Sequence, residues 1–363
     1  MIEDDNTTTP APTQAELLAV EIGDWAPLGG GVRLELAGRR TVLVGRNGSG
    51  KSALLEGIWL GGGWGDEFSD YSAAGRRKAM AIARLTLAPK RARFEFKDSD
   101  GELLFYECKL GNHDEGHYWR PGQPEIAVPY DGLVEECLLE VLGIRRILAG
   151  VPRHTSLRSR QIVTVPKQMD CKYLNRDEPR IGSLAEQMVS RYYHFADGKE
   201  AVAEIAELGQ RIGAWESLLI DSYQRRDDPD ALASVLVDGV DLGLVSDGTL
   251  RIVEVLWAMV HHARKDFRTL LIEEPETGVH PGLLAGLLDT IDAYSIDRQV
   301  IVSTHSPQVV SWAKPQELRV VTREAGKTQV RPLSEQQVAQ FLKYLHDQTL
   351  GEFVYSGALD DEG

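Results

Sequence analysis

The feature that most constrains the fold of this chain is a glycine-rich segment of eight residues, Gly45, Arg46, Asn47, Gly48, Ser49, Gly50, Lys51 and Ser52. It follows a compact apolar run and precedes a helical pattern, which is the setting of a phosphate-binding loop of the form G-x-x-x-x-G-K-[ST]. Its glycines let backbone N–H groups converge on phosphate oxygens, and the start of the next helix favours anions. We expect Lys51 to bridge the β- and γ-phosphates and Ser52 to offer its hydroxyl to Mg²⁺.

Two adjacent carboxylates, Glu273 and Glu274, follow the apolar run Leu270–Ile272. Magnesium-dependent hydrolysis of a nucleoside triphosphate needs one carboxylate to hold a metal-bound water and another to polarise the attacking water. We assign the first role to Glu273, as a metal ligand beside Ser52, and the second role to Glu274. For Glu276, a role in the approach to the next helix and a plain surface role remain equally open.

Two further polar groups stand where ligands commonly bind. His305 follows the apolar strand pattern Val300–Ser303, and ligands gather at the carboxyl ends of parallel strands, so His305 could donate to a γ-phosphate. Ser246 and Gly248 directly precede a helical pattern and could form an anion-binding helix start. Taken alone, Ser246-Asp247-Gly248 is also a common turn and cap.

The alternation of strand and helix patterns in the C-terminal half predicts an α/β fold with a mostly parallel sheet. Strand patterns nearer the N-terminus add an antiparallel β portion, and long helical periodicity over residues 184–225 indicates an inserted, largely helical lid region. We divide the chain into a disordered leader (1–14), an N-terminal lobe with the phosphate-binding loop (15–90), an inserted lid (91–235), a C-terminal lobe (236–333) and a C-terminal helix and tail (334–363).

Composition narrows the possible settings. The chain has 40 Lys and Arg against 55 Asp and Glu, a formal net charge of −15, which disfavours a generic nucleic-acid coat but leaves a local basic patch open. No apolar run approaches the ~20 residues of a membrane span, so we expect no membrane partner. The polar, acidic start lacks a secretory signal, and three widely spaced cysteines form no disulfide framework, so a cytoplasmic location fits best.

The order of these motifs resembles the ABC-type ATPase heads of the SMC and RecF branch, and most closely the OLD-like ATPases. The phosphate-binding loop of that family matches residues 43–52, and its short Ser-x-Gly-x signature matches 246–249. Its EEPE-x-x-x-HP stretch matches 273–281, and its S-T-H-S-P switch matches 303–307. The resemblance covers roughly residues 17–60 and 235–325.

The resemblance implies ATP and Mg²⁺ as cofactors, bound between two heads of a homodimer. Ser246 and Gly248 would then act in trans on the nucleotide held by the partner, and His280 would lie in the loop that crosses between the two sites. Asp247 replaces a glycine of the familiar signature, which calls for a compensating cation such as Arg251. Glu273 replaces the usual aspartate. For the glutamine loop of the family, Gln161 and Gln168 are the candidates.

The resemblance further implies a biological role, by analogy. We expect an ATPase that serves as the sensor or regulatory subunit of a bacterial anti-phage complex, with a separate effector protein such as a nuclease. Two alternatives stay open. One is a DNA-repair or chromosome-maintenance ATPase of the RecF type, and the other is a slowly hydrolysing ATP-dependent scaffold that holds an effector.

Overall fold

The structure is a computed structural model that describes residues 16–62, 91–97, 101–109, 115–128, 149–151, 163–165, 184–224, 231–263, 269–296 and 298–344. The predicted leader at 1–14, the two candidate glutamines Gln161 and Gln168, and the tail beyond 344 lie outside the described residues.

A six-stranded sheet forms the centre of the fold, in the order β16-β15-β3-β14-β13-β8. All neighbouring strands are parallel except the hairpin of β15 and β16. Their bounds are Arg40–Val44 for β3, Ala149–Val151 for β8, Thr269–Glu273 for β13, Gln299–Thr304 for β14, Leu318–Glu324 for β15 and Lys327–Pro332 for β16. The strands β3 and β14 are buried at every residue, as expected of parallel strands covered on both faces.

A second six-stranded sheet is wholly antiparallel, in the order β2-β1-β4-β5-β6-β7. Its strands are Glu16–Trp25 (β1), Gly30–Glu35 (β2), Arg91–Lys97 (β4), Leu103–Lys109 (β5), Glu115–Trp119 (β6) and Ile126–Val128 (β7). The expected start of the insertion at residue 91 is therefore corrected. Because β4 pairs with β1 along its length, residues 91–128 contribute strands to the sheet of the N-terminal lobe.

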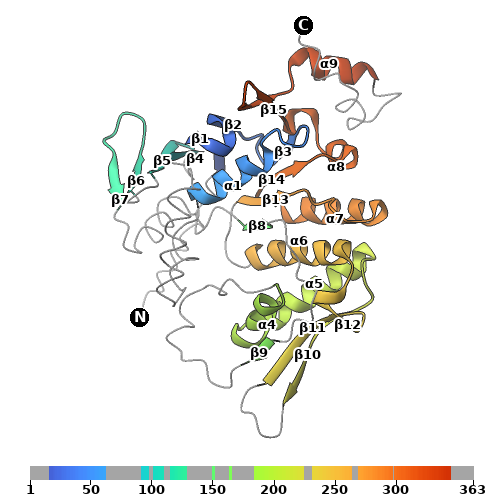
Figure 1. Cartoon of the computed structure of the whole chain (residues 1–363). Helices are drawn as coiled ribbons and strands as arrows, with labels where there is room; N and C mark the ends of the chain where they lie inside the picture. Colours follow the sequence, from blue (N-terminus) through green and yellow to red (C-terminus); the bar gives the residue numbers. More distant parts are fainter. Residues whose placement is uncertain are drawn as a thin grey trace, which may run out of the picture.

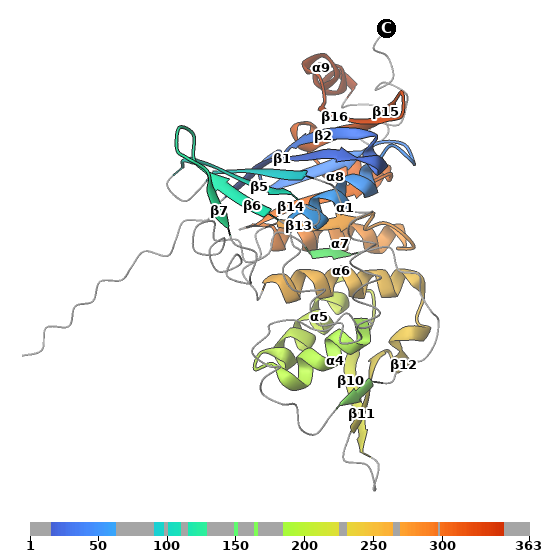
Figure 2. The same ribbon diagram turned by 60° about the vertical axis from the view of Figure 1, so that its left-hand side comes forward.

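Helix α1 (Lys51–Gly62) lies between the two sheets (Figure 2). The alternation of side chains along the parallel strands explains why both faces are apolar. Leu43, Leu271 and Ile301 pack towards α1 and the antiparallel sheet, whereas their neighbours Ile272 and Val302 belong to the core on the opposite face. The central sheet thus separates two hydrophobic cores.

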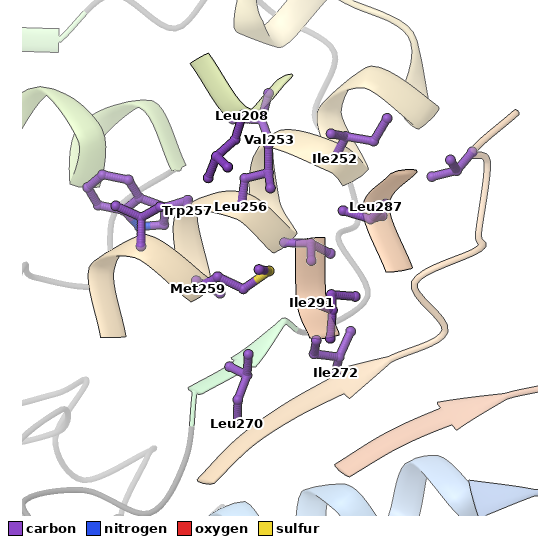
Figure 3. Packing of buried hydrophobic residues seen from close by; sticks show 14 of the residues in the cluster. Leu208, Ile252, Val253, Leu256, Trp257, Met259, Leu270, Ile272, Leu287 and Ile291 are labelled. Atoms are coloured by element: carbon purple, nitrogen blue, oxygen red, sulfur yellow. The ribbon is translucent and has the colours of Figure 1, made fainter. Parts of the chain in front are cut away.

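Helices cover the opposite face of the central sheet in successive layers (Figure 1). They are α4 (Leu184–His194), α5 (Gly198–Ile212), α6 (Asp247–Ala263), α7 (Pro281–Tyr294) and α8 (Pro307–Trp312). Helix α6 is buried on all sides from residue 251 to 261. Figure 3 shows why: its side chains meet Leu208 of α5, Leu287 and Ile291 of α7, and Leu270 of β13.

A small sheet closes the far end of the helical layers (Figure 1). It contains β9 (Val163–Val165), β10 (Leu218–Gln224), β11 (Ala231–Val237) and β12 (Val240–Asp241). The helical periodicity expected up to 225 ends earlier, because Gly213 adopts φ 82° and terminates α5. The described part of 91–235 contains the two helices α4 and α5 together with strands.

The C-terminal helix expected after residue 333 is α9 (Glu335–Tyr344). Within the described part of the chain, no helix combines the length and the apolar character needed to cross a membrane.

Candidate nucleotide-binding site

The neighbouring parallel strands β3, β14 and β13 end side by side, so the motifs that follow them lie at one edge of the central sheet. In the register of the sheet, Thr304 of β14 pairs with Val44 of β3, and Ser303 pairs with Glu273 of β13. The phosphate-binding loop leaves β3 directly after Val44, and His305 follows Thr304. The structure thus gathers the loop, the two adjacent glutamates and the histidine where ligands of parallel α/β sheets bind.

The carbonyl groups of the phosphate-binding loop bind the ammonium group of its own lysine, Lys51. The Nζ of Lys51 donates to the carbonyl oxygens of Gly45 at 2.7 Å and Arg46 at 3.1 Å, and only 4% of Lys51 is exposed. Ser49 is also buried, whereas Arg46, Asn47, Gly48 and Ser52 are exposed. These two bonds hold the ammonium group inside the loop.

Two glycines of the loop are required by a close approach from the β15–β16 hairpin. A Cβ at Gly45 would lie 2.1 Å from the carbonyl oxygen of Val321, and a Cβ at Gly50 would lie 2.3 Å from Oγ1 of Thr328. Gly50 also adopts φ 110°, which side chains rarely permit. Thr328 is 1% exposed and donates from Oγ1 to the carbonyl oxygen of Ser49 at 3.1 Å. The β15–β16 hairpin therefore packs directly against the phosphate-binding loop.

Glu274 stands in an unusual backbone conformation. Its φ is 44°, in the left-handed region, and its N–H donates to the carbonyl oxygen of Ser303 at 2.8 Å. Its side chain is only 6% exposed and accepts from Oγ1 of Thr277 at 3.3 Å. Strained backbone of this kind is concentrated at functional positions, because the surrounding structure must maintain it.

His305 lies beside two carboxylates. Its Nδ1 is 3.3 Å from Oε1 of Glu274 and 3.5 Å from Oε1 of Glu276. The imidazole is 45% exposed, whereas both glutamate side chains are more than nine-tenths buried. A buried carboxylate next to a partly exposed histidine is the kind of arrangement that can accept and hold a proton.

Glu56 is a carboxylate of this site that the sequence motifs did not identify. It lies on α1, four residues after Ser52, so both residues lie on the same face of the helix. Partial desolvation raises the pKa of Glu56, and the charge of Glu273 raises it further. The one available signal was this helical spacing from Ser52. Negative charge is therefore concentrated around Glu273.

The signature residues lie at the start of α6. The Oγ of Ser246 accepts from the backbone N–H of Thr249 at 3.1 Å, which is the pattern of a helix N-cap. Ser246 itself is exposed. Gly248 is required for packing, because a Cβ there would lie 2.2 Å from the carbonyl oxygen of Gly278. The signature turn and the loop after β13 are thus in close contact.

The structure corrects the expectation that Arg251 compensates Asp247. Arg251 is buried, and its Nη1 donates to Oε2 of Glu254 at 3.1 Å. Its Nη2 donates to the carbonyl oxygen of Glu273. The guanidinium therefore joins α6 to the end of β13, because a buried cation needs anionic and carbonyl acceptors around it.

His280 has a local structural role as well. Its Nδ1 accepts from the N–H of Gly282 at 3.1 Å and so caps α7. The residue is exposed, on the loop that runs from β13 to α7.

Comparison with known proteins gives one family match, over part of the chain. A protein-family model described as "AAA domain, putative AbiEii toxin, Type IV TA system" matches residues 173–311. This stretch contains the signature turn, the adjacent glutamates and His305, and it does not include the phosphate-binding loop. No curated protein is similar to the chain.

Smc head domains are among the similar solved structures. An Smc head with an extended coiled coil, bound to the C-terminal domain of ScpA from Pyrococcus furiosus, has a TM-score of 0.57 at 14% identity and covers 92% of this chain and 100% of its own. An Smc head from Pyrococcus yayanosii has a TM-score of 0.54 at 12% identity, covering 92% and 100%. An Smc head bound to the winged-helix domain of ScpA has 0.53 at 16%, covering 89% and 99%. The chain therefore has the fold of an SMC-type ATPase head.

Proposed function

We propose that this chain binds and hydrolyses ATP with Mg²⁺ at the carboxyl edge of its central sheet. One observation carries the proposal: β3, β14 and β13 end in register and bring together the phosphate-binding loop, His305 and the adjacent glutamates. In this assignment, Gly45, Asn47, Gly48 and Gly50 offer the backbone of the loop to the phosphates, and Lys51 binds their oxygens.

The side chains present suit a magnesium ion. Mg²⁺ is commonly held by one or two protein oxygens together with substrate phosphates, and Ser52 and Glu273 supply such oxygens. The raised pKa of Glu56, caused partly by Glu273, marks a concentration of negative charge that a divalent cation would offset. When bound, the ion would neutralise charge on the phosphates.

The chain's own groups then divide the remaining work. Glu274 accepts a proton from the attacking water, and its buried side chain keeps the carboxylate in one place, with Thr277 as a donor. His305 stands beside it and contacts the γ-phosphate. Steady-state turnover by the wild type and by Glu274→Gln tests this. Equal hydrolysis by both proteins would remove Glu274 from the role of base.

We infer that two copies close around ATP. Ser246 is exposed at the start of α6, where a helix N-terminus favours an anion, and it suits the nucleotide of a second copy. Light scattering of Glu274→Gln with ATP should give twice the monomer mass, and the same protein without nucleotide should give the monomer mass. A monomer in both conditions would contradict the ATP-dependent dimer.

The biological role follows by analogy, since a fold does not fix a function. The matched family model names a toxin of a toxin–antitoxin system, and two of the similar Smc heads are bound to a separate protein, ScpA. We propose a sensor or regulatory subunit in an anti-phage complex, acting from the cytoplasm on a separate effector. Affinity purification from the native host, with ATP and without it, should recover that effector.

The alternatives are separable by the same measurements. On the described part of the antiparallel sheet, Arg33 is paired with Glu95 and Arg91 with Glu107, which leaves less positive charge for a RecF-type DNA surface. Salt-sensitive binding to duplex ends would favour that alternative. Persistent ATP-dependent assembly with very slow turnover would favour a scaffold.

A further inference from the structure

We infer that Glu276 is a positioning residue that holds the His305 loop in its working conformation, an inference that rests on the proposed ATPase function. Sequence motifs left the role of Glu276 open. In the structure, its side chain is 8% exposed and lies under the loop that follows β14.

A single carboxylate oxygen organises this loop. The Oε1 of Glu276 accepts from Oγ1 of Thr304 at 2.6 Å and from the backbone N–H of His305 at 3.0 Å. The Oγ1 of Thr304 in turn accepts from the backbone N–H of Ser306 at 2.9 Å. Three successive residues of the loop are thereby tied, directly or through one hydroxyl, to the same atom.

The same oxygen also lies near the imidazole. Nδ1 of His305 is 3.5 Å from Oε1 of Glu276 and 3.3 Å from Oε1 of Glu274. Glu276 therefore fixes both the backbone and the ring position of His305 relative to Glu274. Hydrogen bonds to an ionised acceptor are stronger than neutral ones, so a carboxylate suits this task.

Burying the carboxylate of Glu276 lowers the stability of the fold unless the group also has another role. The second oxygen of Glu276, Oε2, is buried and has no hydrogen-bond partner among the described residues. A buried polar atom without a partner costs free energy, and an apolar residue would avoid that cost. Retaining such a group beside Glu274 agrees with a role in catalysis, because small displacements of catalytic groups greatly reduce rates.

The test compares Glu276→Gln with Glu276→Ala in steady-state ATP turnover, alongside the affinity for a fluorescent ATP analogue. Glutamine keeps an acceptor oxygen for Thr304 and His305, whereas alanine removes it. We expect Glu276→Ala to lower kcat by roughly 10- to 100-fold with affinity nearly unchanged, and Glu276→Gln to retain most of the wild-type kcat. Exposed Glu207→Gln, in a surface pair with Arg211, is the matched control.

A second pair keeps the test usable if Glu276→Ala does not fold. Thr304→Val removes the hydroxyl at nearly constant volume, and Thr304→Ser keeps it. We expect kcat to fall for valine and to be retained for serine. Wild-type kcat in both Glu276→Ala and Thr304→Val would overturn the inference, and so would a glutamine variant as slow as alanine. If the wild type itself shows no turnover, the proposed function fails instead.

Discussion

The two parts of the candidate site are held in very different ways. At the carboxyl edge of the central sheet, Lys51, Glu274 and Glu276 are buried and bound to neighbouring groups. At the start of α6, Ser246 is exposed, and its hydroxyl forms hydrogen bonds with Thr249, three residues away. The first part is built within one chain. The second part, the start of α6, is already folded as a capped helix, but its serine faces solvent. Such a surface is suited to contact another molecule.

Replacing Lys51 with alanine should have the largest effect, because it removes the only charged side chain of the loop whose ammonium lies inside the cradle. Loss of a buried charged contact costs about 3 kcal/mol, which is roughly a 100-fold weaker affinity. Titration of a fluorescent ATP analogue measures it. An affinity within twofold of wild type would show that the cradle does not bind the triphosphate.

Ser246→Asp should affect only the outward-facing part. Aspartate is as good an N-cap as serine, so the melting temperature should stay the same. The added negative charge should repel the phosphates of a partner-bound nucleotide and lower turnover by about tenfold. Ser246→Asn is the neutral control and should retain activity. If both variants turn over ATP like the wild type, Ser246 does not meet a nucleotide.

Gly248→Ala should weaken the contact between the two loops. The new Cβ would lie 2.2 Å from the carbonyl oxygen of Gly278, so the loops must separate. Overpacking of this kind costs about 1–3 kcal/mol, and thermal unfolding should show a lower melting temperature. Gly31→Ala is the comparison, because Gly31 is exposed, its φ lies outside the left-handed region, and a Cβ there would meet its nearest atom at 3.6 Å, an ordinary contact. An unchanged melting temperature for Gly248→Ala would contradict the close packing.

Glu56→Gln should have the smallest effect, and it should raise the melting temperature rather than lower it. Burial and Glu273 raise the pKa of Glu56 above 4.5, so the folded state binds this proton more readily than the unfolded state. The ionised group therefore destabilises the fold at neutral pH, and this cost disappears as pH falls through the raised pKa. Without Mg²⁺ or nucleotide, the variant should melt higher than wild type at pH 8 and nearly equally at pH 4. Glu207→Gln should show no such difference.

The sequence predicted best what depends on neighbouring residues. The strand patterns near 270 and 300 correspond to β13 and β14, and the glycine-rich segment lies between β3 and α1 as expected. These features are local: a buried parallel strand is a continuous apolar run, and the loop carries its own motif.

What the sequence did not predict depends on contacts between distant segments. The pairing of β1 with β4 joins residues separated by a stretch of unrelated sequence, so residues 91–128 resembled part of an insertion. Arg251 was the expected cation to compensate Asp247, yet it donates to Glu254 and to the carbonyl oxygen of Glu273. The hydrogen bond of Glu276 to Thr304 could not be inferred either, because it requires β13 and β14 to be aligned in register.

The contact of Thr328 with the phosphate-binding loop connects β16, an edge strand of the central sheet, to the candidate site. Its hydroxyl donates to the carbonyl oxygen of Ser49 and lies against Gly50 of the glycine-rich loop. A protein that binds β16 would therefore change the conformation of the loop without contacting the nucleotide. A partner protein bound to β16 would then act on the proposed ATPase by moving one strand.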